Sequence, residues 1–360
     1  MAKLGEVCLL KAGKFVSAND ISPEYNKGLY PCFGGNGIRG YVADYTHDGE
    51  FPLIGRQGAL CGNVNLASGK FHATEHAVVV QPKIEMNVHW LYYALNAMNL
   101  GQYATGAAQP GLAVSKLETL SIEIPNISEQ NKIAQTLYKV EQLVNFRKQQ
   151  LDKLDELVKA RFVEMFGDIS NSRKVPMQDV CKIITDGTHQ PPKFVLSGIP
   201  FLFVSNIVTN EIHYDAEKFI SEETYNELIK RTPIEVGDVL LSTVGSYGHP
   251  AVVKENKPFC FQRHIAYLKP NNSVVNSEYL RCAILSTDLQ RQIDESVKGI
   301  AQKTLNLSEI RKLRLPLPSL SLQNQFAAFV ERVDQQKQTV QQSLDKLELM
   351  KKALMQEYFG

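Results

Sequence analysis

The sequence lacks the features that mark membrane, secreted and metal-binding proteins. No stretch of about 18 uncharged apolar residues occurs, which argues against a membrane-spanning helix. The start, MAKLGEVCLL, becomes charged too early for a signal peptide, so we expect a cytoplasmic chain with no membrane partner. The six cysteines lie far apart, with no Cys-x-x-Cys pair and no Cys–His cluster at zinc spacing. Such cysteines are typical of small buried side chains, and we expect no metal site.

The sequence also has no excess of charge of one sign. It has 39 Lys and Arg residues and 38 Asp and Glu residues, so its formal net charge is +1. A protein that holds nucleic acid by bulk electrostatics alone is usually basic, so this balance argues against that class. The hydrophobic fraction of 44% is that of a folded protein, and 360 residues suggest two or three domains.

The familiar catalytic motifs are absent as well. Walker A, Gly-x-Ser-x-Gly and His-Glu-x-x-His do not occur, and the glycine-rich stretches do not follow Gly-x-Gly-x-x-Gly at a strand–helix junction. The sequence therefore predicts neither catalytic residues nor a cofactor site in this chain.

What the sequence does contain is an internal repeat. When the chain is shifted by 193 residues, 106–167 aligns with 299–360 without a gap, and 23 of the 62 positions are identical. The matches include the pairs Gln130-Asn131 and Gln323-Asn324. The upstream parts match only loosely: each has a glycine-rich stretch followed by a predicted strand that begins with His and ends in Pro. The chain is thus a tandem duplication of a two-part module.

The second part of each module predicts a long helix, 128–167 and 321–360. Each follows a proline, has a serine suited to N-capping (Ser128, Ser321), and contains no further Pro or Gly before its closing Phe-Gly. Apolar residues recur every three or four positions, the seam of a coiled coil. The predicted seam residues are Ile133, Leu137, Val140, Val144, Leu151, Leu154, Phe326, Val330, Val333, Val340, Leu344 and Leu347.

Charged residues interrupt this seam in one copy where the other copy is apolar. Arg147 corresponds to Val340, Arg161 to Leu354, and Lys337 to Val144. This pattern favours pairing of the first long helix with the second over self-association of either helix with a copy of itself. The alternative is that each helix packs only on its own domain.

The first part of each module is predicted to be α+β, with a mostly antiparallel or barrel-like sheet. Short β-branched runs alternate with Gly, Pro and Asn turns, and short helices are expected near Trp90–Leu95 and Tyr279–Leu285. Ser115 begins a capping-box pattern before the first long helix, and Ser308 is its counterpart before the second. The predicted domains are 1–127, 128–167, 168–320 and 321–360.

Loops in both copies are rich in the residues that read base edges of DNA. Glycine among them allows a backbone to approach a duplex closely. Taken singly, each is an ordinary turn residue, but they cluster at corresponding places in the two copies. The candidate DNA-binding residues are Asn36, Arg39, Arg56, Gln57, Asn63, Gln109, Thr188, His189, Ser242, Thr243, Tyr247, Arg263, Gln302 and Lys303.

In this ordered set of motifs the chain resembles the specificity subunit of type I restriction–modification systems. The resemblance covers essentially the whole length. It rests on two variable domains alternating with two similar long helices, on Tyr30–Gly40 (YPCFGGNGIRG), on Asp186–His189 (DGTH) followed by Pro191-Pro192, and on the Pro-x-x-Ser-x-Gln-Asn helix entries.

The resemblance implies two target recognition domains, each reading half of a split double-stranded DNA sequence, and an antiparallel coiled coil as spacer. It implies a non-catalytic subunit that assembles with two modification (methyltransferase) subunits and with restriction (translocase and nuclease) subunits. S-adenosylmethionine, ATP and Mg would then be bound by those partners. The family commonly carries extra sequence before the first strand, whereas here Leu4–Val7 comes almost at once.

Other functions remain open on the residues alone. A coiled-coil interaction scaffold without sequence-specific DNA binding, a stand-alone nuclease or methyltransferase, and an anti-restriction or recombination partner are alternatives. Residues 1–127 carry 9 basic and 10 acidic side chains, and 168–320 carry 18 and 17. Since neither domain is basic, we expect the isolated chain to hold DNA weakly and its partners to neutralise most of the phosphates.

Overall fold

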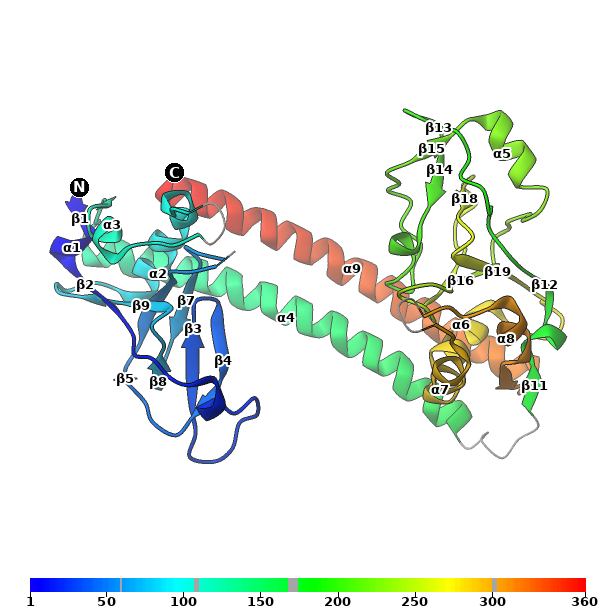
Figure 1. Ribbon diagram of the computed structural model, residues 1–360, viewed down its shortest axis with the longest axis horizontal. Helices are drawn as coiled ribbons and strands as arrows, with labels where there is room; N and C mark the ends of the chain where they lie inside the picture. The colour runs from blue at the N-terminus through cyan, green and yellow to red at the C-terminus, as the bar shows by residue number, and fades with distance from the viewer. Residues whose placement is uncertain (59, 107–109, 168–173, 300–302) are drawn as a thin grey trace. The chain divides into compact units, whose positions relative to one another are not determined.

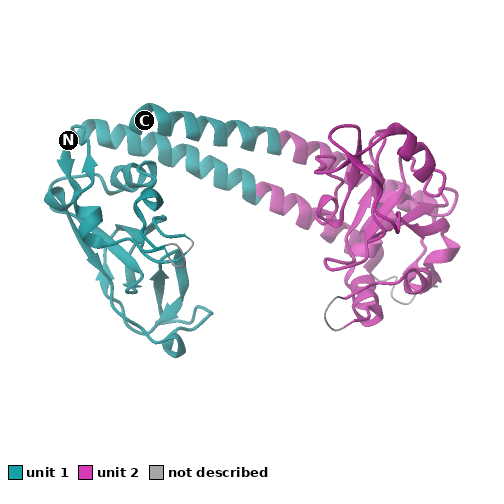
Figure 2. Cartoon of the chain, turned by 45° about the horizontal axis from the view of Figure 1, so that its top comes forward, with its two compact units in different colours: residues 1–149, 341–360 teal, residues 150–340 magenta. Residues whose placement is uncertain are grey.

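The computed structural model describes residues 1–58, 60–106, 110–167, 174–299 and 303–360. The chain forms two compact units, each built from one globular part and portions of both long helices (Figure 2). Unit 1 comprises Met1–Gln149 and Gln341–Gly360, and unit 2 comprises Gln150–Val340.

The globular part of unit 1 is a mixed α/β structure (Figure 1). Its elements are β1 (Ala2–Lys3), α1 (Leu4–Val7), β2 (Cys8–Ala12), η1 (Ala18–Asp20), β3 (Tyr30–Gly34), β4 (Gly37–Val42), β5 (His47–Asp48), β6 (Phe51–Gly55), β7 (Val64–Ala67), β8 (Lys70–Ala73), β9 (Ala77–Pro82), α2 (Val88–Ala97), η2 (Leu100–Tyr103), α3 (Val114–Glu118) and β10 (Ser121–Ile122).

The globular part of unit 2 repeats this plan with different loops. Its elements are β11 (Lys174–Pro176), η4 (Met177–Asp179), β12 (Cys181–Asp186), β13 (Phe194–Val195), β14 (Ile199–Leu202), η5 (Val204–Asn206), β15 (Phe219–Ile220), α5 (Glu222–Leu228), β16 (Val239–Ser242), β17 (Pro250–Val252), β18 (Cys260–Phe261), β19 (Ile265–Pro270), α6 (Ser277–Leu285), α7 (Thr287–Ser296), α8 (Leu307–Lys312) and β20 (Arg314–Pro316).

Each unit has two four-stranded sheets, and the first of them has the same strand order in both units. The sheet β2-β9-β6-β7 corresponds to β12-β19-β16-β17, and both are antiparallel throughout. The sheet β4-β3-β8-β5 corresponds in part to β13-β15-β14-β18, and each contains one parallel pair, β3–β8 and β14–β18. The expected α+β class with a mostly antiparallel sheet is confirmed.

Alternation along the central strands separates two cores. In β9, Val78 and Val80 lie in the core that faces the helices, while Ala77 and Val79 face the second sheet. A strand buried on both faces reads as a continuous apolar run, because successive side chains point to opposite sides. The sheet of unit 1 therefore lies between helices on one face and a second sheet on the other.

The long helices are α4 (Ile127–Phe166) and α9 (Leu320–Phe359), each starting one residue before the predicted helix. Ser128 and Ser321 do not cap them. The Asn126 side chain accepts from the Glu129 N–H at 3.0 Å, and the Ser319 hydroxyl accepts from the Leu322 N–H at 3.4 Å. The residue directly after each proline serves as the cap, so the prediction was two residues late.

The predicted capping role of Ser115 and Ser308 is also wrong. Helix α3 begins at Val114 and α8 at Leu307, so each serine already lies inside its helix. The residues at the N-cap positions, Ala113 and Asn306, make no side-chain capping bond.

Within each unit the two long helices run antiparallel. In unit 1, Lys351 Nζ lies 2.7 Å from Glu141, and Arg147 Nε donates to the Ser343 hydroxyl at 3.1 Å. In unit 2, Lys337 Nζ lies 2.9 Å from Asp155. Burial alone would lower the pKa of Lys337, but the hydrogen bond and charge of Asp155 raise it above its ordinary value. The charged seam residues Arg147 and Lys337 thus find partners on the opposite helix, whereas Arg161 pairs with Glu164 of its own helix at 2.7 Å.

The predicted seam residues divide into two groups. Leu154, Val333 and Val340 form a helix–helix cluster with the half-buried Leu151. Val140, Val144 and Leu344 are also buried, and Leu347 is half-buried. By contrast, Ile133 and Leu137 belong to the main core of unit 1, and Phe326 and Val330 to that of unit 2. The same apolar stripe first covers a sheet and then continues as the helix–helix seam.

The far end of each long helix completes the core of the other module's globular part. In unit 1, Leu354, Met355, Tyr358 and Phe359 of α9 pack on the core that contains Trp90. In unit 2, the α4 residues Val158, Phe162, Met165 and Phe166 join the core that contains Tyr279. The alternative, in which each helix packs only on its own domain, is therefore wrong.

The repeated glutamines join the short helix to the long helix in each unit. Gln130 Oε1 accepts from the Asn87 N–H at 2.9 Å while its amide donates to the Pro125 carbonyl at 2.8 Å. Gln323 makes the same pair of bonds with Asn276 and Pro318, at 2.8 and 2.9 Å. Both side chains are buried, at 2% and 0% exposure. Their repetition therefore has a structural cause.

Candidate nucleic-acid interface

Polar loops gather at one end of the sheets in unit 1. The strands β2, β9, β6 and β7 are antiparallel neighbours. The same end of this sheet therefore holds the last residues of β2 and β6 and the first residues of β9 and β7. The β3–β4 turn and the end of β8 meet the same edge, since β3 runs parallel to β8. We call this the polar end of unit 1; it comprises residues 13–15, 34–37, 56–58, 60–63 and 74–76.

The corresponding loops form the polar end of unit 2, by the same topology. It comprises residues 187–189, 203–206, 243–249 and 262–264. The described candidate residues lie at these ends, with three exceptions. Arg39 lies within β4, Ser242 is the last residue of β16, and Lys303 directly precedes Thr304.

A backbone frame common to both units holds the loop after the central strand. In unit 1, Arg56 N donates to the His76 carbonyl at 3.0 Å, and Leu112 N donates to the Arg56 carbonyl at 2.9 Å. In unit 2, Thr243 N donates to His264 and Leu305 N to Thr243, at 2.9 and 2.8 Å. Arg56 and Thr243 thus occupy equivalent positions, although one is a long cation and the other a small hydroxyl.

The repeated segment continues this frame as a hairpin beside each loop. Thr105 and Gly111 exchange two backbone bonds of 2.8 Å, as Lys298 and Thr304 do at 3.0 and 2.8 Å. The candidates Gln109 and Gln302 lie outside the described residues. The two globular parts therefore share this backbone frame, although their sequences match only loosely.

In unit 1 the candidate side chains face solvent or one another. Asn63 Nδ2 donates to Asn36 Oδ1 at 2.7 Å, and both residues are exposed, as are Arg39 and Gln57. The Arg39 chain packs on Gly34, where a Cβ would come within 2.9 Å of Arg39 Cδ. Arg56 is half-buried, and its Nε has no hydrogen-bond partner within the described part of the chain.

In unit 2 the exposed candidates are His189, Arg263 and Lys303. His189 Nε2 lies 3.0 Å from the Asp186 carboxylate, which also pairs with Arg231. Thr188 is held in the loop, its hydroxyl donating to the Gln190 carbonyl at 2.9 Å. Burial, and then the charge of Arg263, lower the pKa of His264 beside them.

Two candidates are not presented at the surface. Ser242 is 0% and Thr243 5% exposed. The Ser242 hydroxyl accepts from the His249 N–H at 2.9 Å, and Thr243 is held by the frame described above. The expectation that they face DNA is wrong, because both side chains are buried and the Ser242 hydroxyl is bonded within the turn.

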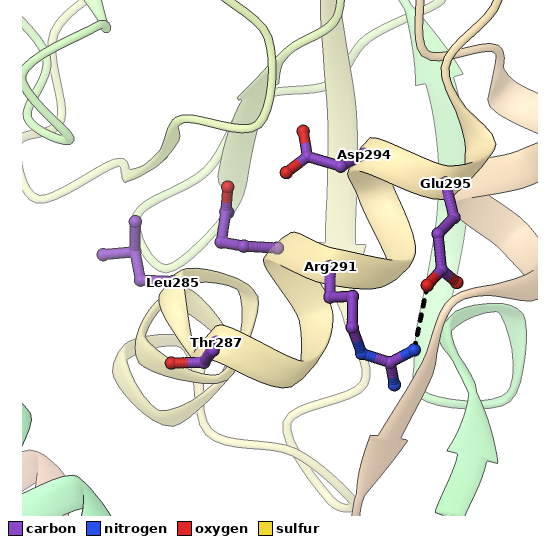
Figure 3. Close-up of a pocket in the computed structure, with 6 residues that line it drawn as sticks. Leu285, Thr287, Arg291, Asp294 and Glu295 are labelled. Carbon is purple, nitrogen blue, oxygen red and sulfur yellow. Dashed lines mark hydrogen bonds and ion pairs between the residues drawn. The ribbon is translucent and has the colours of Figure 1, made fainter.

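Tyr247 lies half-buried between Lys303 and α7. Its ring is 5.9 Å from Lys303 Nζ, and its hydroxyl donates to Asp294 at 2.9 Å. Figure 3 shows the open hollow on α7 next to this contact, lined by Leu285, Thr287, Gln290, Arg291, Asp294 and Glu295. Arg291 is paired there with Glu295 at 2.9 Å, so the hollow offers no free cation to a phosphate.

The described residues hold no group of three His, Cys, Asp or Glu side chains that could bind a metal ion. Burial raises the pKa of Cys8 to about 11 and those of Cys181 and Cys260 to about 12. Thiols of this kind are poor nucleophiles and ligands at neutral pH. Within the described residues, no helix is long and apolar enough to span a membrane.

The fold thus defines a class: a duplicated α+β module with two loop surfaces on a shared backbone frame. The family model of the type I restriction modification DNA specificity domain matches residues 1–156 and 170–349. The chain therefore belongs to this family and carries the domain twice. The resemblance predicted from the motifs is confirmed. The family supplies DNA target recognition to restriction–modification systems and is not itself catalytic.

Individual relatives agree with this assignment. The chain is 53% identical over 143 residues to the EcoprrI specificity subunit of Escherichia coli, a match that covers 39% of this chain and 36% of that subunit. It therefore spans only about a third of that relative's length. It is 18% identical over 321 residues to the MjaVIII specificity subunit of Methanocaldococcus jannaschii, covering 83% and 75% of the two chains.

The crystal structure of a type I restriction–modification S subunit from M. genitalium shares the fold. It superposes with a TM-score of 0.62 at 17% identity, covering 99% of this chain and 95% of the other.

Proposed function

We propose that this chain is the DNA-specificity subunit of a type I restriction–modification complex, and that each polar end reads one half of a bipartite target. The observation that carries the proposal is the shared frame with unlike side chains. Equivalent backbone bonds hold Arg56 in one unit and Thr243 in the other, while the exposed side chains at the two polar ends differ: Gln57 and Asn63 in unit 1, His189 and Arg263 in unit 2. A common backbone frame that presents different side chains in the two units suits the recognition of two different half-sites.

The proposal includes partners that supply the chemistry. Two modification subunits would bind S-adenosylmethionine and methylate the target, and restriction subunits would use ATP and Mg. The near-neutral charge supports this division, since a chain with 39 cationic and 38 anionic residues neutralises few phosphates by itself.

Single-arginine variants test the reading of half-sites. Replacing Arg263, exposed in the β18–β19 turn, by Ala is expected to weaken recognition of one half-site about 5- to 150-fold, the equivalent of about 1–3 kcal/mol for a bidentate base contact. Arg56→Ala is expected to impair the other half-site only. Methylation rates on DNA with single-base changes in each half-site measure both effects.

Arg332→Ala, which removes an exposed arginine from α9, is the matched control and should leave both half-sites unchanged. Equal loss on every DNA sequence with a shallower salt dependence would assign the arginine to a phosphate and contradict its role in base reading.

An apolar surface on the long helices of unit 1 is the proposed docking site of a modification subunit. Leu143, Phe146, Leu349 and Met350, here called the apolar flank, are 45%, 59%, 69% and 42% exposed. Leu143 precedes the seam residue Val144, and Met350 precedes Lys351, which contacts Glu141 on the opposite helix, so Leu143 and Met350 lie on the same side of the antiparallel pair. Outward positions of a coiled coil are normally polar, which marks this surface for a partner helix.

Replacing Leu143 and Met350 together by Ser should weaken binding of the modification subunit at least tenfold, because about two apolar side chains lose their burial. Size-exclusion chromatography and titration calorimetry with the purified modification subunit measure this. Gln336 and Thr339 occupy the equivalent positions to Leu143 and Phe146 in the second copy, and Gln336→Ser with Thr339→Ser is the control. Unchanged affinity of the Leu143/Met350 variant would refute this docking site.

A further inference from the structure

A loop of unit 1 that carries no recognisable motif stands in the same place as the Asp186–His189 loop of unit 2. Gly13 N donates to the Ala77 carbonyl at 3.0 Å, and Lys14 N donates to Ala73 at 2.8 Å. In unit 2, Gly187 N donates to Ile265 and Thr188 N to Phe261, both at 3.2 Å. Lys14 and Phe15 are therefore the structural counterparts of Thr188 and His189.

A glycine is required at the start of both loops. A Cβ on Gly13 would lie 2.1 Å from the Ala73 carbonyl oxygen, and one on Gly187 would lie 2.2 Å from that of Phe261. No side chain fits at such distances, so the backbone of each loop is fixed against the neighbouring strand end. The loop in unit 1 is held further by His72, whose Nε2 lies 3.2 Å from the Lys14 carbonyl oxygen.

Phe15 projects from this fixed backbone into solvent. At 76% exposure it is the most exposed aromatic residue of the described chain. Lys14 beside it is exposed as well. An exposed phenyl ring next to an ammonium group matches the two surfaces of DNA, because rings stack on or wedge between bases while cations contact the adjoining phosphates.

The position of the loop points to the same ligand. Residues 13–15 belong to the polar end of unit 1, where Asn36, Arg56, Gln57 and Asn63 also lie. At the equivalent place in unit 2, His189 is exposed and paired with Asp186. The two units thus present an aromatic–cation pair and an imidazole–carboxylate pair on the same backbone.

We propose that Phe15 contacts a base step of the half-site read by unit 1 and that Lys14 contacts the neighbouring phosphate. This inference rests on the proposed function and deepens it, since it assigns a stacking contact to one half-site. Phe15 then sets specificity through the deformability or stacking of a base step, in addition to the hydrogen bonds made by its neighbours.

The test uses the chain assembled with its modification subunits and compares Phe15→Ala, Phe15→Trp and Lys14→Gln. Ile84, 47% exposed just after β9 and therefore at the opposite end of the same sheet, gives the control Ile84→Ala. Methylation is measured on duplexes carrying every single-base change in both half-sites. 2-Aminopurine placed at each position of the half-site reports unstacking.

Phe15→Ala should lower methylation of the intact target roughly 5- to 100-fold and relax base preference in one half-site, with loss of the 2-aminopurine signal there. Phe15→Trp should retain both, and Lys14→Gln should weaken binding uniformly and reduce the salt dependence. Behaviour of Phe15→Ala like Ile84→Ala would overturn the proposal. So would loss of assembly with the modification subunits, since Phe15 would then be a protein contact.

The proposed function fails on a different result. If the wild-type assembly itself methylates no bipartite sequence, the specificity role is wrong, whatever the Phe15 variants do. If wild-type methylation is intact and Phe15→Ala matches it, only the inference on Phe15 is wrong.

Discussion

Adding seven residues to α4 and seven to α9 is expected to lengthen the gap between the two half-sites while leaving the bases of each half-site unchanged. Both helices are single 40-residue elements that run through both units. Seven residues add about 10 Å at about 1.5 Å per residue, which is the rise of about three base pairs. A whole heptad also keeps the apolar seam in register.

The insertions are placed after Phe146 in α4 and after Lys346 in α9. The Glu141–Lys351 and Arg147–Ser343 contacts show that these two points lie nearly opposite each other in the antiparallel pair. Methylome sequencing of cells that carry the lengthened chain measures the new gap. The control is an insertion in α4 alone, which breaks the register and should abolish methylation. An unchanged gap combined with an altered half-site would show that the helices do not set the spacing.

Replacing Gln130 by Ala is expected to lower the free energy of unfolding of unit 1 by about 2–4 kcal/mol. The change leaves the Asn87 N–H and the Pro125 carbonyl without their buried partner, and each orphaned group costs about 1–3 kcal/mol. Trp90, the only tryptophan of the chain, is 1% exposed, and its backbone N–H donates to Asn87 Oδ1 at 2.9 Å. Its fluorescence therefore follows this contact during urea unfolding.

Gln135→Ala provides the matched control, because Gln135 is an exposed glutamine on the same helix; it should shift the transition by less than about 0.5 kcal/mol. Gln323→Ala should destabilise unit 2 to a similar degree, measured by hydrogen exchange of the α6 amides. A Trp90 transition that is unaffected by Gln130→Ala would mean that the repeated glutamine has another role.

The repeat itself allowed much of the fold to be predicted. The ungapped match of 106–167 with 299–360 identified both long helices and their seam, because apolar spacing and the absence of Gly and Pro are local properties. The role of Gln130 and Gln323 was not predictable, since their partners Asn87 and Asn276 lie in the parts that align poorly. Tertiary contacts of this kind leave no periodic signal.

The site was predictable only in part, for two physical reasons. Polar residues in a glycine-rich run can support the turn instead of facing solvent, which is why Ser242 and Thr243 were misjudged. The loop of Lys14 and Phe15 was missed because it shares a single residue, Gly13 against Gly187, with its counterpart. Only the backbone hydrogen bonds reveal that the two loops are equivalent.

The charge balance acquires a clearer meaning on this fold. The polar end of unit 1 offers Lys14 and Arg56, and that of unit 2 offers Arg263, while Asp186 and Asp294 pair with residues beside them. A few cationic side chains on each surface can make selective contacts but provide little non-specific affinity for the DNA phosphates. We therefore expect the isolated chain to bind non-specific DNA weakly at physiological salt.

The most direct test of the central claim is methylome sequencing of cells that express the modification subunits with and without this chain. The account predicts a bipartite methylated motif, two specified half-sites around an unspecified gap, that appears only when the chain is present. A continuous motif, or the same methylation without the chain, would contradict it.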